Sequence, residues 1–280
     1  MRVVCAGLAT VDLVYRTDRI PAADEKVQAL SAEIAAGGPA TNAAVTAAAL
    51  GAEVTLVSAV GAHPLGDLIR ADLAAYGVTL LDAAADSPAP PPISAVTVLA
   101  ATGQRSIVSR NAEDTAVSVP AGFDRVLAGA DVVLVDGHHP ALALAAARSG
   151  RPLVVDAGSR RPVFPRVLPF ADVVACSAAF APDPAAVLGT GARHLAVTAG
   201  PDPVRWWSGD RSGTVPVPPV AAVDTAGAGD AFHGALAVAV ARDPGIDDLA
   251  GALAYAIGVA GVRVTHRGPR SWLTHLPHPR

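Results

Sequence analysis

Near its carboxyl end the chain reads Val223-Asp224-Thr225-Ala226-Gly227-Ala228-Gly229-Asp230-Ala231-Phe232-His233-Gly234-Ala235, a glycine-rich turn that runs straight into an apolar helix. Unpaired backbone N–H groups and the helix dipole make the start of such a helix a binding site for an anion. A dinucleotide site is excluded, because the third glycine of a GxGxxG pattern would fall on Phe232. The stretch therefore predicts a phosphate site at a helix N-terminus.

Asp230 ends this turn and sets a carboxylate beside the predicted phosphate. A carboxylate and a phosphate repel each other, so a carboxylate at this position indicates a chemical role. An alcohol that is about to receive a phosphoryl group needs a base to accept its proton, and an aspartate suits that role. The alternative is an aspartate that only caps the helix amides. The spacing alone leaves both roles open.

Composition narrows the class of protein. Lys26 is the only lysine, so the chain has no GxxxxGK[ST] phosphate loop, and a phosphate site must use arginine, backbone amides and metal. The net charge is −4 without a basic cluster, which argues against a nucleic-acid surface.

Neither a membrane span nor a secretory signal is evident, so a cytoplasmic protein is expected. Cys5 and Cys176 form no CxxC pair and are expected to be buried thiols.

Strand patterns alternate with helical patterns over most of the chain. Strands are predicted at 54–60, 131–136, 152–156, 172–176 and 194–198, and helices at 65–76, 141–149, 231–241 and 246–262. The strands are nearly continuous runs of Val and Leu, which is typical of a parallel sheet covered by helices on both faces. This order predicts an α/β fold around a mainly parallel sheet.

Two stretches, 14–34 and 93–110, break this order, because each has a β-type alternation with no helix closely after it. The second stretch turns back at Thr102-Gly103. Together they predict a small sheet that projects from the main domain and can close over a ligand or pair with a second subunit. An ordinary edge extension of the main sheet is the alternative.

The glycine-rich stretch resembles a signature of the PfkB, or ribokinase-like, carbohydrate kinase family, whose DTxGAGD pattern is matched at 224–230. A second family signature is matched in form by Gly37-Gly38-Pro39-Ala40-Thr41-Asn42, followed by Leu50-Gly51-Ala52 and Val60-Gly61-Ala62-His63-Pro64-Leu65-Gly66. The resemblance implies one ribokinase-like three-layer domain over 1–280, with a β lid formed by about 13–35 and 92–111. It also implies phosphoryl transfer from ATP-Mg²⁺ to a hydroxyl of a small carbohydrate.

The resemblance assigns roles within the turn. Gly227, Ala228 and Gly229 would offer backbone amides to the transferring phosphoryl group, and Asp230 would accept the hydroxyl proton. Asp224 matches a position that binds a monovalent cation, such as K⁺, in many members of the family.

The sugar-binding residues implied by the resemblance are Asp12, Gly37, Gly38 and Asn42. Short carboxylate and amide groups suit paired hydroxyls. Two structural alternatives stay open, because Asp12 can cap a turn and Asn42 can cap the helix that follows it.

On the nucleotide side, the resemblance points to Thr198 and Gly200 for the adenosine-site turn and to Arg105 for a lid arginine that reaches a phosphate. Arg105 as a solvated hairpin arginine is the alternative. Pro203 replaces the second glycine of the family's TxGxxG pattern, which leaves the shape of that loop open.

The family's NxxE motif is absent where it is expected. The chain reads Ser177-Ala178-Ala179-Phe180, so Ser177 keeps one hydrogen-bonding group and Phe180 replaces the carboxylate. Asp136 and Asp156, at predicted strand ends, are candidates for the missing carboxylate. A serine at the first position of this motif, together with the loss of the carboxylate, resembles ketohexokinase-like and sulfofructose-kinase-like members of the family. The resemblance to sulfofructose kinases implies an arginine near His138 that binds the sulfonate group. No arginine lies near His138 in the sequence, so a sulfo-sugar substrate is disfavoured.

Two other functions remain open from the sequence: a nucleoside kinase of the same fold, and a catalytically weak sugar-binding sensor, suggested by the missing NxxE motif. A homodimer is also expected. Four apolar lid side chains would need a cover, and an isologous contact between two lids would bury Val96, Val98, Ile107 and Leu30.

Overall fold

A computed structural model describes residues 1–112, 116–180 and 183–276. Its main sheet has nine strands in the order β13-β12-β11-β10-β9-β8-β1-β4-β5. Neighbouring strands from β11 to β5 are parallel, whereas the β11–β12 and β12–β13 pairs are antiparallel. These strands are β1 (Arg2–Ala6), β4 (Glu53–Ser58), β5 (Val78–Asp82), β8 (Val132–Val135), β9 (Leu153–Ala157), β10 (Val173–Ser177), β11 (His194–Ala199), β12 (Asp202–Ser208) and β13 (Arg211–Val215).

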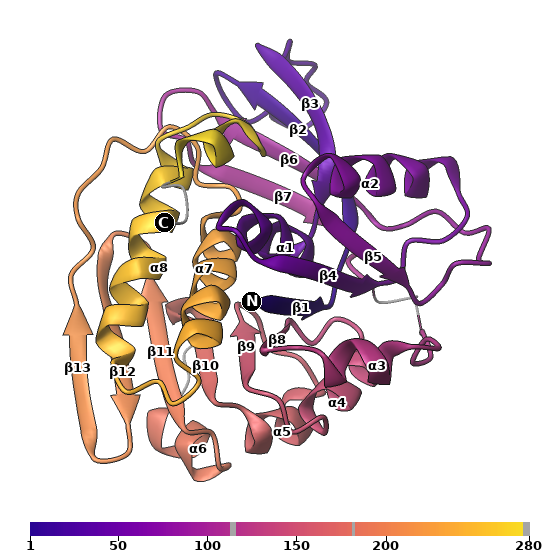
Figure 1. Cartoon of the computed structure of the whole chain (residues 1–280). Helices are drawn as coiled ribbons and strands as arrows, with labels where there is room; N and C mark the ends of the chain where they lie inside the picture. The colour runs from indigo at the N-terminus through magenta and orange to yellow at the C-terminus, as the bar shows by residue number, and fades with distance from the viewer. Residues whose placement is uncertain (113–115, 181–182, 277–280) are drawn as a thin grey trace.

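Helices cover both faces of this sheet, which confirms the expected layered α/β fold (Figure 1). Strand β1 shows why, because its side chains alternate between two apolar cores: Val3 and Cys5 enter one, Val4 and Ala6 the other. The first core lies under α1 (Pro39–Ala49), α2 (Pro64–Ala75), α7 (Ala228–Arg242) and α8 (Leu249–Val264). The second lies under α3 (Phe123–Ala128), α4 (Pro140–Ala147), α5 (Phe164–Val167) and α6 (Pro184–Gly189).

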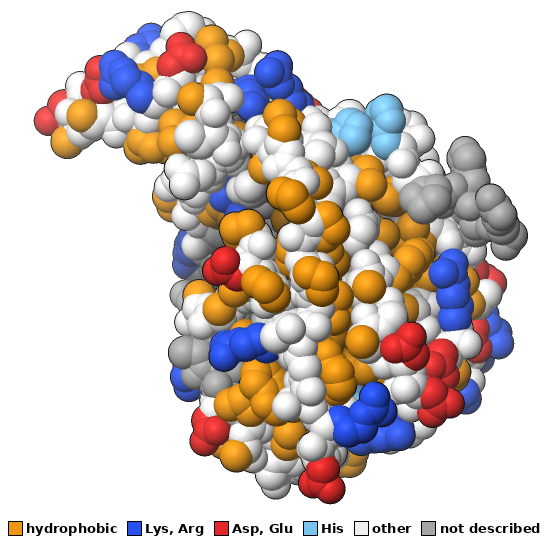
Figure 2. Space-filling view, turned by 90° about the vertical axis from the view of Figure 1, so that its left-hand side faces the viewer, with side chains coloured by type: hydrophobic (Ala, Val, Ile, Leu, Met, Phe, Trp, Pro, Cys, Tyr) orange, Lys and Arg blue, Asp and Glu red, His pale blue; other side chains and the backbone are white. Residues whose placement is uncertain are grey.

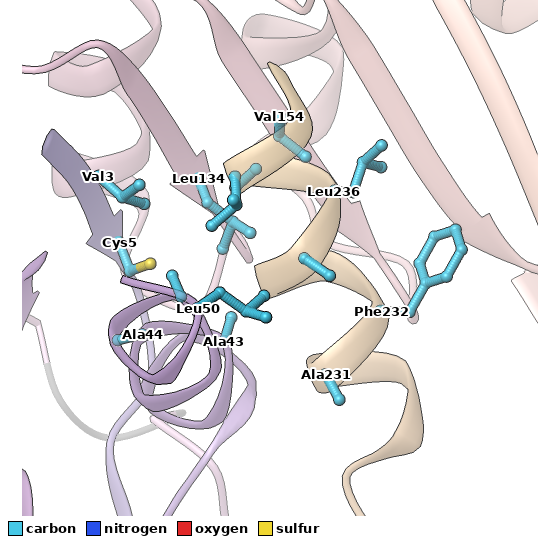
Figure 3. Packing of buried hydrophobic residues seen from close by; sticks show 14 of the residues in the cluster. Val3, Cys5, Ala43, Ala44, Leu50, Leu134, Val154, Ala231, Phe232 and Leu236 are labelled. Carbon is cyan, nitrogen blue, oxygen red and sulfur yellow. The ribbon is translucent and has the colours of Figure 1, made fainter. Parts of the chain in front are cut away.

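Helices α1 and α7 approach each other closely, and this contact positions the site. A Cβ on Gly234 would lie 2.5 Å from the Ala43 carbonyl oxygen, so only glycine fits there. Alanines of both helices are buried in the same core, and Figure 3 shows Ala43 of α1 close to α7, in front of the strands. Because both helices begin at the same end of the molecule, the close packing brings Asn42 of α1 to Asp230 of α7.

The predicted small sheet is present, and it projects from the body (Figures 1 and 2). Its order is β3-β2-β6-β7, from β2 (Thr10–Thr17), β3 (Ser31–Gly37), β6 (Ile93–Leu99) and β7 (Arg105–Ser109). The β2–β6 pair is parallel, and the other two pairs are antiparallel. We refer to this sheet as the lid sheet.

One expectation about the lid sheet is wrong. Val96 and Val98 are buried, at 3% and 1% exposure, because they share with Asp12 the face that is turned toward the body. The exposed apolar residues are instead mainly on the opposite face, with Ile34 at 60% and Val108 at 75% exposure. Leu30 and Ile107 are exposed, as expected.

The predicted strands and helices of the main domain agree with the observed ones within a few residues, whereas β5, β12, β13, α3, α5 and α6 are not predicted by the sequence patterns. Both cysteines are buried free thiols, and burial raises the pKa of Cys176 to about 12. In the described ranges, no helix has both the length and the apolar character needed to cross a membrane.

Candidate active site

The predicted phosphate turn lies at the N-terminus of α7, where Gly227 is the N-cap residue. Gly227 has φ of +70°, which places it in the left-handed region that favours glycine. The Ala231 N–H donates to the Gly227 carbonyl at 2.9 Å, so the helix begins within the motif itself. Asp230 stands in the first helical turn and is half-buried. The arrangement matches the predicted placement of the carboxylate beside an anion site.

Asn42 contacts Asp230 directly. Its Nδ2 donates to Asp230 Oδ2 at 2.8 Å, while its Oδ1 accepts from Arg270 Nη1 at 3.1 Å. An arginine can only donate, so this contact fixes which end of the amide faces Asp230. The two residues are separated by 188 positions, and both are predicted site residues.

Asp12 lies on the lid sheet and is predicted to hold sugar hydroxyls. Thr10 Oγ1 donates to its Oδ1 at 2.6 Å. A Cβ on Gly37 would lie 2.0 Å from Asp12 Oδ2, so glycine leaves the space that this carboxylate fills. Burial raises the pKa of Asp12 and nearby Asp230 raises it further, while hydrogen bonds from Thr10 and Ser94 oppose the shift. Asp12 and Asp230 therefore lie close enough to interact electrostatically.

Gly38 follows Gly37 and is the N-cap of α1, with φ of +96°. A Cβ there would lie 2.4 Å from the Leu8 carbonyl oxygen. Both the left-handed backbone and the close approach require glycine. The glycine pair therefore joins the lid sheet to α1 and sets the distance between Asp12 and Asn42.

Arg270 is a site residue that the sequence patterns do not reveal. Its Nη2 donates to Asp72 Oδ2 at 2.8 Å and to the Ala36 carbonyl, and its guanidinium lies over the Tyr76 ring. Asp72 and Tyr76 therefore fix the arginine that orients Asn42. No motif marks Arg270, because its partners come from α2 and from the end of β3.

Asp224 is buried and has a full set of donors from the chain itself. Its Oδ1 accepts from Ala226 N–H at 3.0 Å, and its Oδ2 accepts from Gly268 N–H at 3.0 Å. Arg263 Nη2 lies 3.4 Å from Oδ2, and both side chains are at most 4% exposed. Burial lowers the pKa of Arg263, and Asp224 opposes that shift. This surrounding does not fit the monovalent cation expected at Asp224.

Two lid arginines contact the loop that leads into the phosphate turn. Arg105 Nη1 donates to the Thr225 carbonyl at 3.0 Å, and Arg16 Nη2 donates to the Val223 carbonyl at 2.9 Å. Arg105 is exposed, whereas Arg16 is 8% exposed. A pocket of about 540 Å³ opens between the lid and Thr225, lined by Ile20, Leu99, Gln104, Arg105, Ser106, Ile107 and Thr225. Arg105 therefore lies beside the predicted phosphate turn.

The predicted nucleotide residues lie at the carboxyl ends of neighbouring parallel strands, where ligands of open α/β sheets bind. Ser177 ends β10 and is the registered partner of Thr198 in β11. Ser177 Oγ accepts from Ala179 N–H, and Thr198 Oγ1 donates to the Cys176 carbonyl. Gly200 has φ of +62° in the turn between β11 and β12. That hairpin answers the question of loop shape, and Pro203 belongs to its second strand.

Phe180, which replaces the family's carboxylate, is a packing residue. Its ring makes an edge contact with Phe164 at 6.4 Å between centroids, and Arg160 lies over it at 5.1 Å. The contact holds the short helix at 178–180 against the second core. No carboxylate function can come from this position.

Of the two replacement candidates, Asp136 is committed to structure. Its oxygens accept from the backbone N–H groups of Leu8, Ala40 and His138. Burial alone would raise the pKa of Asp136, but His138 and the backbone N–H groups of Leu8 and His138 hold it at about 2. Asp136 therefore ties β1, α1 and β8 together at the edge of the site.

Asp156 is the better placed of the two. Its Oδ1 accepts from Gly158 N–H at 2.9 Å, and its Oδ2 lies 3.3 Å from His233 Nδ1. Burial raises the pKa of Asp156 and Asp230 adds to the shift, whereas His233 opposes it. The contact with His233, three residues after Asp230, places Asp156 near the N-terminal end of α7.

The expectation about His138 is wrong. Arg161 Nη2 contacts His138 Nε2, although 23 positions separate the two residues. The loop after β9 brings the arginine to the end of β8, because these strands are neighbours in the sheet. An arginine near His138 is therefore present, and its absence no longer counts against an anionic sugar.

A comparison with protein families matches residues 1–179 and 183–275 to the pfkB family carbohydrate kinases. The chain belongs to this family. It is 29% identical to a ribokinase of Bacillus subtilis, over 96% of this chain and 94% of the relative. It is also 29% identical to an ATP-dependent ribose-1-phosphate kinase of Halopiger xanaduensis, over 97% and 94%. A ribokinase structure from Giardia lamblia has the same fold, with a TM-score of 0.85, 22% identity and coverage of 99% and 96%.

The family confirms the expected class of enzyme, an ATP-dependent sugar kinase, and the ribokinase-like fold. The likeness to ketohexokinase-like and sulfofructose-kinase-like members rests on motif wording alone, whereas the likeness to a ribokinase extends over nearly the whole chain. The roles of individual site residues stay predictions.

Proposed function

We propose that the chain transfers the γ-phosphoryl group of ATP to a hydroxyl of a ribose-like or ketohexose-like sugar, with Asp230 as the base. The Asn42–Asp230 contact carries this proposal. The N–H of Asn42 occupies Oδ2 and leaves Oδ1 to accept the hydroxyl proton. Asp12, beside Gly37, would bind a neighbouring hydroxyl and hold the acceptor in line.

The start of α7 would stabilise the phosphoryl group during transfer. Backbone amides of Gly227, Ala228 and Gly229 and the helix dipole favour negative charge there. Arg105, held at Thr225, would add a positive charge from the lid. Ser177, Thr198 and Gly200 would hold the nucleotide at the strand ends.

Magnesium would enter as the ATP complex and spread the charge of the phosphates. Asp156 fits the role of organising this ion, directly or through water, because it lies near Asp230 and is not consumed by capping as Asp136 is. Asp156→Asn would then raise the Mg²⁺ concentration needed for half-maximal turnover, whereas an unchanged requirement would contradict this role.

We also propose that residues 1–280 form one domain, although 113–115, 181–182 and 277–280 lie outside the described residues. In this domain the lid sheet would close over the sugar. The outer face of the lid sheet carries Tyr15, Ile34, Ile93 and Val108, each more than 40% exposed. A second lid would cover this face in an isologous homodimer. Light scattering tests this, since Ile34→Asp with Val108→Asp should convert a dimer to a monomer. A wild-type monomer at micromolar concentration contradicts the dimer.

The sugar itself is identified by a panel. ADP release is measured with ribose, ribose 1-phosphate, fructose and a nucleoside as acceptors, because the relatives include kinases of the first two. Turnover of one sugar supports the proposal, and preference for the nucleoside favours the alternative nucleoside kinase. Binding of a sugar in a thermal-shift assay without ADP release would instead indicate a sensor. A kinase that uses ATP is expected to work in the cytoplasm.

A further inference from the structure

The surroundings of Asp224 resemble an ion site that already contains a positive charge. Arg263 Nη1 donates to the His266 carbonyl at 3.0 Å and approaches the Asp224 carbonyl at 3.5 Å. Its Nη2 lies 3.4 Å from Asp224 Oδ2. Two carbonyl oxygens and a carboxylate oxygen thus surround one guanidinium. Oxygen atoms of this kind are the ligands that replace the hydration shell of a bound alkali cation.

The guanidinium is fixed deep in the protein. Arg263 is 3% exposed, and its guanidinium stays protonated at any physiological pH. It originates in the last turn of α8, where Val264 contributes a carbonyl that accepts from the N–H groups of Val223 and Asp224. The end of α8 and the loop before the phosphate turn are therefore joined around this charge.

The charge also lies beside the phosphate turn. A Cβ on Gly227 would be 3.7 Å from Arg263 Nε, and 3.8 Å from Asp230 Oδ2. A fixed cation at this distance favours negative charge on the turn and on a phosphoryl group bound to it. A mobile cation would have to enter against Arg263 and against two N–H groups that already point at Asp224.

We propose that the Arg263 guanidinium is a built-in cation that takes the place of a monovalent metal ion at Asp224, so that the enzyme works without K⁺. Arg263 is then a positioning residue that shapes the phosphate turn through Asp224. The turnover part of the test rests on the proposed kinase function, but the stability part does not.

The test compares the full chain in KCl and in tetramethylammonium chloride at equal ionic strength. Wild-type Tm should agree within about 1 °C between the two salts, and turnover within about twofold. Arg263→Ala should lower Tm by roughly 5 °C or more in tetramethylammonium chloride, because Asp224 keeps a buried charge without its partner. KCl should restore at least about half of that loss and of the turnover, since K⁺ can then enter.

Arg242→Ala is the matched control, because Arg242 is an exposed arginine of α7 that lies over Tyr255 and away from Asp224. It should show no difference between the salts. If Arg263→Ala does not fold, Arg263→Met takes its place in the comparison, because methionine retains the packing of the arginine stem without the charge.

Two results overturn the proposal. One is a wild-type protein whose Tm is several degrees higher, or whose turnover is several-fold faster, in KCl than in tetramethylammonium chloride. The other is an Arg263 variant equally impaired in both salts, which would make Arg263 a purely structural ion-pair partner. A protein that turns over no sugar in either salt contradicts the kinase function instead, and the Tm comparison still decides the role of Arg263.

Discussion

The two sides of the phosphate turn are built in different ways. On the acceptor side, a hydrogen bond joins Asn42 to Asp230 across 188 positions, and Arg270 belongs to the same network. Asp12, from a third element, is near enough to Asp230 for the second carboxylate to raise its pKa. On the nucleotide side, Ser177 and Thr198 bond within two residues or to the neighbouring strand. The acceptor side is thus fixed by side chains, and the nucleotide side by the backbone of the sheet.

This difference explains where the chain departs from its family. A site held by backbone geometry tolerates new side chains, so Phe180 and Pro203 can replace motif residues there without disturbing the strands. A site held by a network of side chains has less freedom, because each substitution leaves a partner unsatisfied. Substitutions on the acceptor side should accordingly cost more activity than those on the nucleotide side.

The largest effect is expected for Asp230→Asn. The amide removes the base but keeps the shape of the side chain, so kcat should fall by ~10²–10⁴ while sugar affinity stays within about threefold. Steady-state kinetics and calorimetric sugar titration measure the two quantities. Asp243→Asn, at the other end of the same helix, is the matched control. A kcat within threefold of wild type would remove Asp230 from the catalytic role.

Asp12→Asn should lower the activity toward the sugar and, at the same time, raise the thermal stability of the protein at neutral pH. Loss of a carboxylate that binds a hydroxyl should lower kcat/KM for the sugar by ~10²-fold. The raised pKa of Asp12 means that the folded state holds a proton more tightly than the unfolded state. The wild-type protein therefore loses stability as pH rises from about 4, the ordinary pKa, through the raised value.

Asn cannot ionise, so the Tm of Asp12→Asn should exceed that of wild type at pH 7, and the difference should vanish below about pH 4. Differential scanning at several pH values measures this. Asp18→Asn, an exposed residue next to strand β2, is the control for charge alone. A Tm below that of wild type at pH 7 would show that Asp12 is structural.

The sequence predicts the motif residues of both sides and misses the rest for a physical reason. Motif residues such as Asp230 and Asn42 are found because they lie in short continuous patterns. Arg263, Arg270 and Arg161 are missed because their partners are far away in the sequence and become neighbours only when the strands are ordered. The lid sheet is predicted by alternation, but which face is buried depends on its contact with the body, and so Val96 and Val98 are misplaced.

Arg270→Ala tests whether the acceptor network depends on its outermost member. Without Arg270 the Asn42 amide can turn over, and Asp230 loses its N–H partner for part of the time. We expect kcat/KM to fall by ~10–100-fold, because small errors of position are costly in this kind of site. Arg270→Lys should recover little, since an ammonium group cannot bridge Asn42 and Asp72 as the planar guanidinium does.

A double-mutant cycle separates positioning from general destabilisation. If Arg270 acts through Asn42, the Asn42→Ala/Arg270→Ala enzyme should be no slower than Asn42→Ala alone. Fully additive losses would show that Arg270 acts elsewhere, for example by holding α2 to the end of β3.

The smallest effect is expected for Arg105→Ala, because Arg105 is exposed and reaches only the Thr225 backbone and hydroxyl. An exposed arginine contributes little to folding, so Tm should stay within about 1 °C of wild type. Its guanidinium should nevertheless contact a phosphate when the lid closes, so KM for ATP should rise, or kcat fall, by ~3–10-fold. Arg110→Ala, just after the other end of β7, is the control and should leave both constants unchanged. A lowered Tm with full activity would assign Arg105 to the lid's structure and leave the anion turn to its backbone amides and Arg263.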